Sequence, residues 1–209
     1  MRGFHSHMTS RISWLPISAI AVLTALTLSC SKPETFTPAK YTVNSDLIAA
    51  PASFPELDLT IAPPKGWTAV DSVGLARFQL LMSNTELSTK IFPILPVAVF
   101  VDSATGSVMY VARVSNRTDR LSSMAARFEG YLSDKKGTSV LTPARLNVNG
   151  LNLYQYLLTS TDAANYKILG ETSPESRFLI EFIVRSENLE KLQPAFESSM
   201  ATLKAGTTP

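Results

Sequence analysis

Ala144-Arg-Leu-Asn-Val-Asn-Gly-Leu-Asn-Leu-Tyr-Gln-Tyr-Leu-Leu-Thr159 is the segment that best indicates the fold class of this chain. Two runs suited to β-strands, residues 144–148 and 151–159, flank the dipeptide Asn149-Gly150. Asn-Gly favours the two-residue turn that joins antiparallel strands, because both turn residues take positive φ. The stretch therefore predicts a β-hairpin, and with it an antiparallel sheet.

Further strands are expected on both sides of this hairpin, from alternating apolar residues or from β-branched and aromatic content. They cover residues 57–61, 97–101, 108–114, 166–171 and 178–185. Residues 102–107 form a turn between two of them. The strongest strand is Phe178-Leu-Ile-Glu-Phe-Ile-Val-Arg185, in which Glu181 is expected on the exposed side of the pleat.

Three helices are expected, over residues 71–85, over residues 118–134, and from Ser186 or Glu187 to shortly before Gly206. Their apolar residues at helical spacing are Val73, Ala76, Leu80 and Leu81; Leu121, Met124, Ala125, Phe128 and Leu132; and Leu189, Leu192, Phe196 and Met200. Adjacent strands joined by short turns, with helices between them, predict an α+β domain in which helices flank an antiparallel β-sheet.

Residues 1–29 have the three parts of a secretory signal. Arg2 and Arg11 precede the apolar run 14–28, and no acidic residue occurs before Glu34. The run is shorter than the roughly 20 residues that a membrane-spanning helix needs. The signal starts at Met1 or at Met8.

Leu26-Thr-Leu-Ser-Cys30 resembles the lipobox of bacterial lipoproteins, although Thr27 and Leu28 stand in exchanged order. We expect lipidation of Cys30, and hence attachment to a membrane through that lipid. Two alternatives are ordinary signal cleavage after small residues and an uncleaved anchor. Ser31 after the cysteine indicates the outer membrane, with the protein facing the periplasm.

Removal of the signal changes the histidine content and the net charge of the chain. His5 and His7 are lost, and the 19 basic residues fall to 17 without Arg2 and Arg11, against 17 acidic ones. A neutral domain gives no electrostatic reason to expect a nucleic acid partner. Without histidine and with its one cysteine lipidated, the chain lacks Ser-His-Asp, Cys-His and His-containing zinc sites. We expect no catalytic residues, no metal and no cofactor.

The mature chain divides into three parts. Residues 30–56 are expected to be the lipidated cysteine and a tether, because Pro33, Pro38, Pro51 and Pro55 oppose helix and central strand. Within this tether, residues 47–50 could dock onto the domain. The folded domain is expected over residues 57–205, with a tail at 206–209.

The domain resembles the PsbP-like superfamily, which is named after an extrinsic lumenal subunit of photosystem II. The motifs that carry the resemblance are Pro64-Lys-Gly-Trp67, the strand after Asn149-Gly150, and the ending of residues 178–200. The resemblance implies an α-β-α sandwich on an antiparallel sheet. It also implies a binding or assembly protein rather than an enzyme.

Three aromatic residues are the candidates for contact with a partner: Trp67, Tyr154 and Tyr156. Trp67 could instead plug one end of the core. Tyr154 and Tyr156 share one face of their strand, where a helix could equally cover them. The function expected is a membrane-tethered binding or complex-assembly domain with an envelope protein partner. The alternatives are a structural or stress-related lipoprotein and an enzyme with an unfamiliar site.

Overall fold

The computed structural model describes residues 34–115 and 119–206. The compact unit begins at Thr35 and holds all of the elements below. The signal segment, Cys30, Thr118 and residues 207–209 lie outside the described residues. In the part that is described, no helix is both long and apolar enough to cross a membrane.

The main sheet has eight strands in the order β1-β7-β8-β9-β10-β6-β5-β4. Every neighbouring pair is antiparallel except β1 and β7 at one edge. The strands are β1 (Thr37–Pro38), β4 (Thr68–Ala69), β5 (Ile94–Val101), β6 (Val108–Val114), β7 (Val140–Val148), β8 (Leu151–Thr159), β9 (Ala163–Ser173) and β10 (Ser176–Arg185). The predicted α+β class with an antiparallel sheet is confirmed.

One face of the main sheet is covered by α5 (Leu189–Ala201) and a small second sheet. That sheet has the order β11-β3-β2 and consists of β2 (Ala52–Phe54), β3 (Leu59–Ile61) and β11 (Lys204–Ala205). The ring of Phe196 on α5 stacks on Tyr166 at 4.2 Å and meets Phe182 edge-on at 4.5 Å between centroids. Two short 3₁₀ turns, η1 (Pro55–Leu57) and η2 (Ser186–Asn188), precede β3 and α5.

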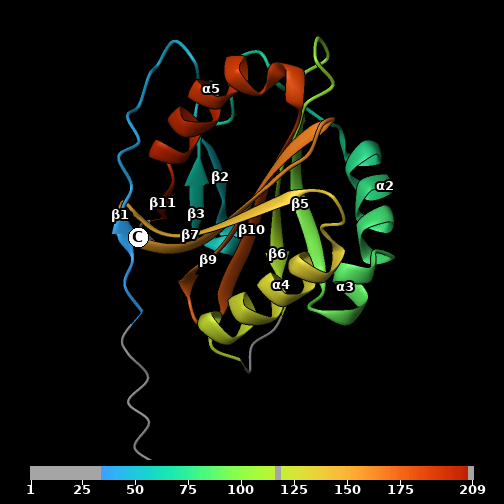
Figure 1. Cartoon of the computed structure of the whole chain (residues 1–209). Helices are drawn as coiled ribbons and strands as arrows, with labels where there is room; N and C mark the ends of the chain where they lie inside the picture. The colour runs from blue at the N-terminus through green and yellow to red at the C-terminus, as the bar shows by residue number, and fades with distance from the viewer. Residues whose placement is uncertain (1–33, 116–118, 207–209) are drawn as a thin grey trace, which may run out of the picture. The chain divides into compact units, whose positions relative to one another are not determined.

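The opposite face is covered by α2 (Ser72–Ser83), α3 (Glu86–Lys90) and α4 (Leu121–Lys135). Figure 1 shows these three helices on the side of the sheet away from α5. The expected stripe of α4 is buried in full: Leu121, Met124, Ala125, Phe128 and Leu132. Helices on both faces of an antiparallel sheet make an α-β-α sandwich with two separate hydrophobic cores.

The β-hairpin forms as predicted. β7 and β8 pair from Val140↔Thr159 to Val148↔Leu151, and Asn149 and Gly150 have φ of 50° and 87°. Positive φ at both positions gives the turn a twist that matches the flanking strands. The Asn149 side chain also donates to the carbonyl oxygens of Ala201 and Leu203, which links the turn to the end of α5.

Helix α2 begins as expected, with the Asp71 carboxylate accepting from the backbone N–H of Gly74 at 2.8 Å. Its burial is the reverse of what its spacing suggested. Val73, Ala76, Leu80 and Leu81 are exposed, whereas Leu75, Phe78 and Met82 pack against the core. The physical reason is that α2 is apolar on both sides, so periodicity alone does not choose its inner face.

The expected tether also differs from the structure over its described part. β1 pairs with β7, Ile48 bridges to Pro64, and the Asn44 backbone N–H donates to the Ser198 hydroxyl at 2.7 Å. Proline is compatible with such edge positions, because an edge strand leaves some N–H groups unpaired in any case. The compact unit therefore starts 22 residues before Leu57, at Thr35.

Candidate binding site

A buried ion pair lies at the centre of the main sheet, on the face that α2, α3 and α4 cover. Glu181 of β10 is only 4% exposed, and the side chain of Lys167 on β9 is 12% exposed. The Lys167 ammonium donates to Glu181 Oε1. The interpretation of Glu181 as the solvated side of its strand is therefore wrong: helices cover that side as well.

Two further donors complete the surroundings of Glu181. The Tyr110 hydroxyl of β6 donates to Oε2, and the Asn165 side-chain amide of β9 donates to Oε1 at 2.5 Å. Burial, and then the neighbouring carboxylate, raises the pKa of Tyr110 well above its ordinary value. The phenol therefore stays a donor through the physiological pH range, and the fold alone supplies three donors to one carboxylate.

A pocket of about 360 Å³ opens above this pair. We name it the Lys167 pocket. The sheet contributes Tyr110, Lys167, Glu181 and Ile183 to its wall, and the remaining lining residues are Phe78 and Met82 of α2, Thr85, Leu87 of α3, and Tyr131 and Leu132 of α4. Most of these side chains are apolar or aromatic, so the pocket offers an apolar volume with a charge pair at one place.

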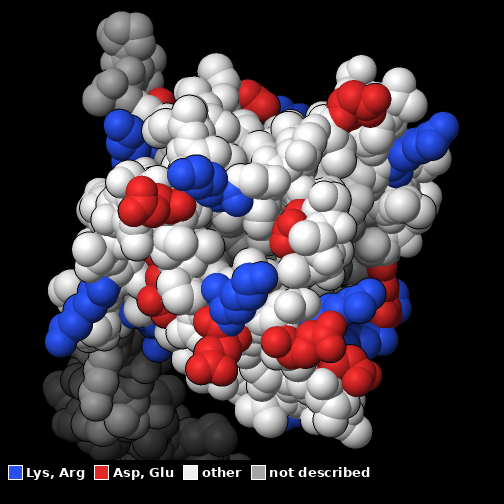
Figure 2. Space-filling model, turned by 90° about the horizontal axis from the view of Figure 1, so that it is seen from above, with Lys and Arg blue, Asp and Glu red and all other residues white. Residues whose placement is uncertain are grey.

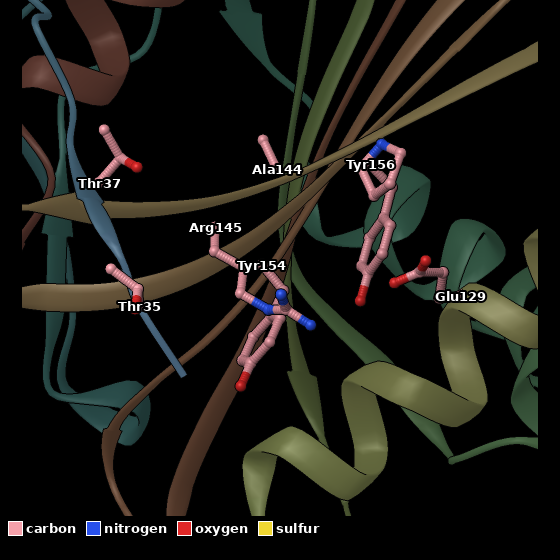
Figure 3. Close-up of a pocket in the computed structure, with 8 residues that line it drawn as sticks. Thr35, Thr37, Glu129, Ala144, Arg145, Tyr154 and Tyr156 are labelled. Carbon is pink, nitrogen blue, oxygen red and sulfur yellow. The ribbon is translucent and has the colours of Figure 1, made fainter. Parts of the chain in front are cut away.

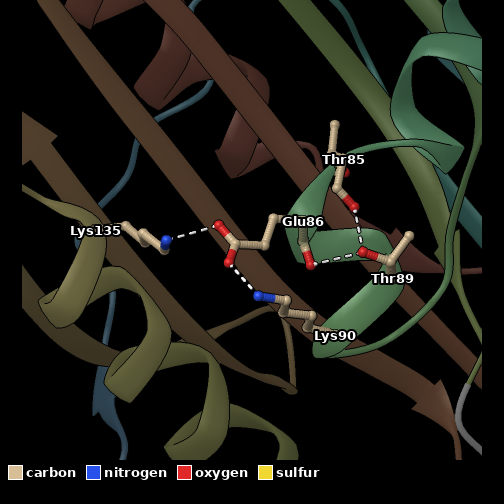
Figure 4. A network of polar contacts seen from close by, with 5 residues as sticks. All are labelled: Thr85, Glu86, Thr89, Lys90 and Lys135. Carbon is tan, nitrogen blue, oxygen red and sulfur yellow. Dashed lines mark hydrogen bonds and ion pairs between the residues drawn. The ribbon is translucent and has the colours of Figure 1, made fainter.

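A bridge of ion pairs joins α3 to α4, two of the helices that contribute residues to the pocket wall. Figure 4 shows Glu86 of α3 between Lys90 on its own helix and Lys135 at the end of α4, each at 2.7 Å. The hydrogen bond from Lys135, followed by that from Lys90, lowers the pKa of Glu86 to about 2. A lowered carboxylate pKa means that the bridge is fully present above the ordinary value near 4.5 and is lost as pH falls toward 2.

A second, more polar pocket contains both candidate tyrosines (Figure 3). It has a volume of about 280 Å³ and lies beside the β7–β8 hairpin, with Arg145 and Glu129 among its lining residues. The Arg145 guanidinium lies 6.0 Å from the centre of the Tyr154 ring. Glu129 comes from α4, so basic and acidic side chains both line the pocket.

The two tyrosines also belong to the core beneath α4. Tyr156 is 1% exposed, its ring meets Phe128 at 5.2 Å, and its hydroxyl donates to the carbonyl oxygen of Ala125 at 2.9 Å. The Tyr154 ring meets Phe36 at 5.3 Å. The surface that they offer is therefore limited to pocket walls, since Tyr154 also lines a further pocket together with Phe36 and Arg120.

Trp67 lies far from both tyrosines in the fold, on the α5 face of the main sheet. It is partly exposed, packs against that core, and has its ring 6.4 Å from the ring of Phe182. The structure therefore does not bring the three candidate aromatic residues into one site.

The outer face of α2 is the main exposed apolar feature of a helix in the described part of the chain. Val73, Leu80 and Leu81 are 57%, 66% and 69% exposed. By contrast, the face in Figure 2 shows Lys and Arg interspersed with Asp and Glu. No group of three or more His, Cys, Asp or Glu residues among those described could hold a metal ion.

The Lys167 pocket was not predicted, although the sequence contains a signal for it. Leu179, Glu181 and Ile183 share one face of β10 by the period-two rule. Two apolar neighbours on that face indicate that the face is covered, and a carboxylate between them needs a partner. Lys167, directly opposite Glu181 in the register, is that partner.

No family model and no curated protein matches this chain in sequence. Among solved structures, it is similar to the solution structure of cyanobacterial PsbP (CyanoP) from Synechocystis sp. PCC 6803. The identity is 12%, the TM-score is 0.44, and the match covers 80% of this chain and 97% of that one. It is also similar to the crystal structure of PA94, a protein of unknown function and putative regulator from Pseudomonas aeruginosa. There the identity is 14%, the TM-score is 0.44, and the coverage is 77% of this chain and 99% of that one.

We expect Glu181→Leu to lower the free energy of unfolding by about 3–5 kcal/mol, because it leaves the buried Lys167 charge without its partner. Adding Lys167→Met should restore a substantial part of that loss. Urea unfolding of the native chain, both single variants and the double variant measures the coupling energy, which should exceed about 1 kcal/mol. Losses that simply add, within about 0.5 kcal/mol, would show that the two side chains do not act as a pair.

Proposed function

We propose that this chain is an envelope lipoprotein, anchored in a membrane through lipid on Cys30, whose folded unit binds a small apolar molecule. Binding without chemistry takes place in the Lys167 pocket. The observation that carries the proposal is that an apolar wall surrounds the ion pair of Lys167 and Glu181, whose opposite charges cancel. Ligand sites in proteins commonly have this composition, with few polar groups in an apolar cavity.

The engagement of Glu181 supports binding rather than catalysis. Both of its oxygens accept hydrogen bonds from protein donors, and the Lys167 ammonium balances its charge. A general acid or base must exchange a proton with a substrate within hydrogen-bond reach. A carboxylate held by three protein donors is better suited to fixing the pocket floor.

The anchor fits the start of the compact unit. Only residues 31–34 lie between Cys30 and Thr35, so five extended steps of at most about 3.6 Å give a reach of about 18 Å. Such a lipoprotein would hold its binding unit close to the bilayer. Ser31 supports placement in the outer membrane, facing the periplasm.

The exposed face of α2 favours a second, compatible role in contact with an envelope protein. Leu80 and Leu81 are more than half exposed and adjacent on the surface of one helix. Clustered exposed apolar side chains are typical of surfaces that meet a partner. Complex assembly would then use the outer side of α2, and ligand binding its inner side.

Filling the pocket should weaken binding of the neutral fluorophore N-phenylnaphthylamine to the full chain in lipid nanodiscs. We expect Met82→Trp to weaken binding at least tenfold, because the larger ring occupies the cavity, whereas Leu81→Trp changes it less than twofold. Leu81 is the matched control, since it neighbours Met82 but faces outward. Equal binding by the two variants, after subtraction of empty nanodiscs, would contradict the proposed site.

Replacement of the anchor residue should remove the lipid. Cys30→Ala is expected to abolish incorporation of labelled palmitate into the protein in growing bacteria, because no thiol remains to accept the lipid. Ser29→Ala keeps a small residue before the cysteine and should retain the label. Labelling that persists in Cys30→Ala, or that is absent from the native chain, would refute the lipid anchor.

The assembly role predicts a crosslinked adduct that depends on α2. Joint replacement of Leu80 and Leu81 by Asp should remove the adduct obtained when cells with the native lipoprotein are crosslinked. Val140→Asp, on an exposed side chain of β7, should leave the adduct unchanged. The same adduct in all three proteins, or none in the native one, would exclude a partner on this face.

A further inference from the structure

The charge pair in the Lys167 pocket offers a ligand more hydrogen-bond donors than acceptors. Lys167 has three N–H donors, and one of them is engaged by Glu181. No second acceptor for Lys167 lies among the described residues, which leaves two donors for a molecule in the cavity that it lines. On Glu181, Oε1 accepts two hydrogen bonds and Oε2 accepts one. The charge pair therefore presents mainly donors to the pocket, and a ligand that complements it must carry an acceptor.

The charge of the pair restricts that acceptor further. An anionic head beside Lys167 would also lie close to the Glu181 carboxylate, so attraction and repulsion would largely cancel while the head lost its water. A cationic head would be attracted by Glu181 and repelled by Lys167, so the two effects would again largely cancel. A neutral carbonyl oxygen can accept from the ammonium without adding a net charge to the buried site.

The rest of the wall sets the body of the ligand. Phe78, Leu87 and Leu132 are apolar, and the Thr85 hydroxyl already donates to the carbonyl oxygen of Met82 at 2.7 Å. The ring of Phe78 lies 5.3 Å from that of Tyr110, so part of the wall is aromatic. A volume of about 360 Å³ is at the small end of the roughly 300–1,000 Å³ range of ligand pockets, so the pocket fits a small molecule.

We propose that the Lys167 pocket selects an uncharged molecule of this size, with an apolar or aromatic body and one carbonyl oxygen that accepts a hydrogen bond from Lys167. This inference rests on the proposed binding function and names its ligand class. Lys167 acts as the specificity-determining residue, and Glu181 sets that specificity by cancelling its charge. The ring-lined part of the wall takes the body of the ligand.

Four probes with a similar phenylalkyl body test the head group: butyrophenone, pentylbenzene, phenylbutyrate and phenylbutylamine. Each competes with N-phenylnaphthylamine for the full chain in nanodiscs, with empty nanodiscs subtracted. We expect butyrophenone to bind about tenfold more tightly than pentylbenzene, as for a hydrogen bond to a charged donor. Both ionic probes should bind more weakly than butyrophenone.

The double variant Glu181→Leu with Lys167→Met tests the origin of the preference. It should bind butyrophenone and pentylbenzene within about twofold of each other, whereas the surface control Lys191→Met should keep the native ranking. If the double variant does not fold by circular dichroism, the ranking of the four probes on the native chain still decides the matter.

The outcomes distinguish the carbonyl preference from the proposed binding function. Equal binding of butyrophenone and pentylbenzene to the native chain would overturn the carbonyl preference, as would tightest binding of either ionic probe. In each of those cases the pocket still binds, so the proposed function stands. The proposed function itself would be overturned if N-phenylnaphthylamine did not bind to the native chain, or if Met82→Trp did not weaken its binding.

Discussion

Glu181 lies on the central strand of the main sheet, and three strands meet at its side chain. In the register, Glu181 is opposite Lys167 on β9 and opposite Tyr110 on β6. A carboxylate removed from water needs a counter-charge and donors, and these two neighbours supply them. A slip of one residue would turn Glu181 toward the other face of the sheet, into the core beneath α5. The ion pair therefore fixes the pairing of β6, β10 and β9, on which both hydrophobic cores are assembled.

The pocket above the pair follows from how the helices share this face. α2 packs mainly over β5 near one edge of the sheet, and α4 lies over β7 and β9 toward the other. The central strand β10 is therefore near the boundary between the two helices, where Ile183 and Glu181 reach the pocket wall. The short helix α3 lies at this boundary, and Glu86 ties it to α4 through Lys135. Since that bridge is solvent-exposed, it contributes little to the stability of the fold.

Much of the framework could be predicted from local patterns. The turn Asn149-Gly150 specifies its hairpin because few residues adopt positive φ twice in succession, and α4 has an apolar stripe bordered by polar residues. α2 lacks such a border, so its sequence alone suits Leu80 and Phe78 equally to the core. Only its packing on β5 selects the face with Phe78 as the inner one. The small sheet joins β2 and β3 to β11 from the other end of the chain. Residues 57–61 were predicted as a strand, but β2 and β11 have only three and two residues and leave no periodic signal. The Lys167 pocket was not predicted for a related reason: Glu181 and Lys167 become partners only through the register of β9 and β10.

In the function that we propose, fold and recognition depend on the same two charges. Removal of either charge alone leaves its partner buried and uncompensated, which acts on stability before it acts on a ligand. A single substitution at Lys167 or Glu181 therefore cannot separate a binding defect from a folding defect. Replacing both residues by apolar ones of similar volume removes the donors while leaving no buried charge, although Tyr110 and Asn165 then lose an acceptor. The selectivity that we propose is thus a by-product of how the central strands are held together: the pair that sets the register also leaves spare donors, and no net charge, facing the pocket.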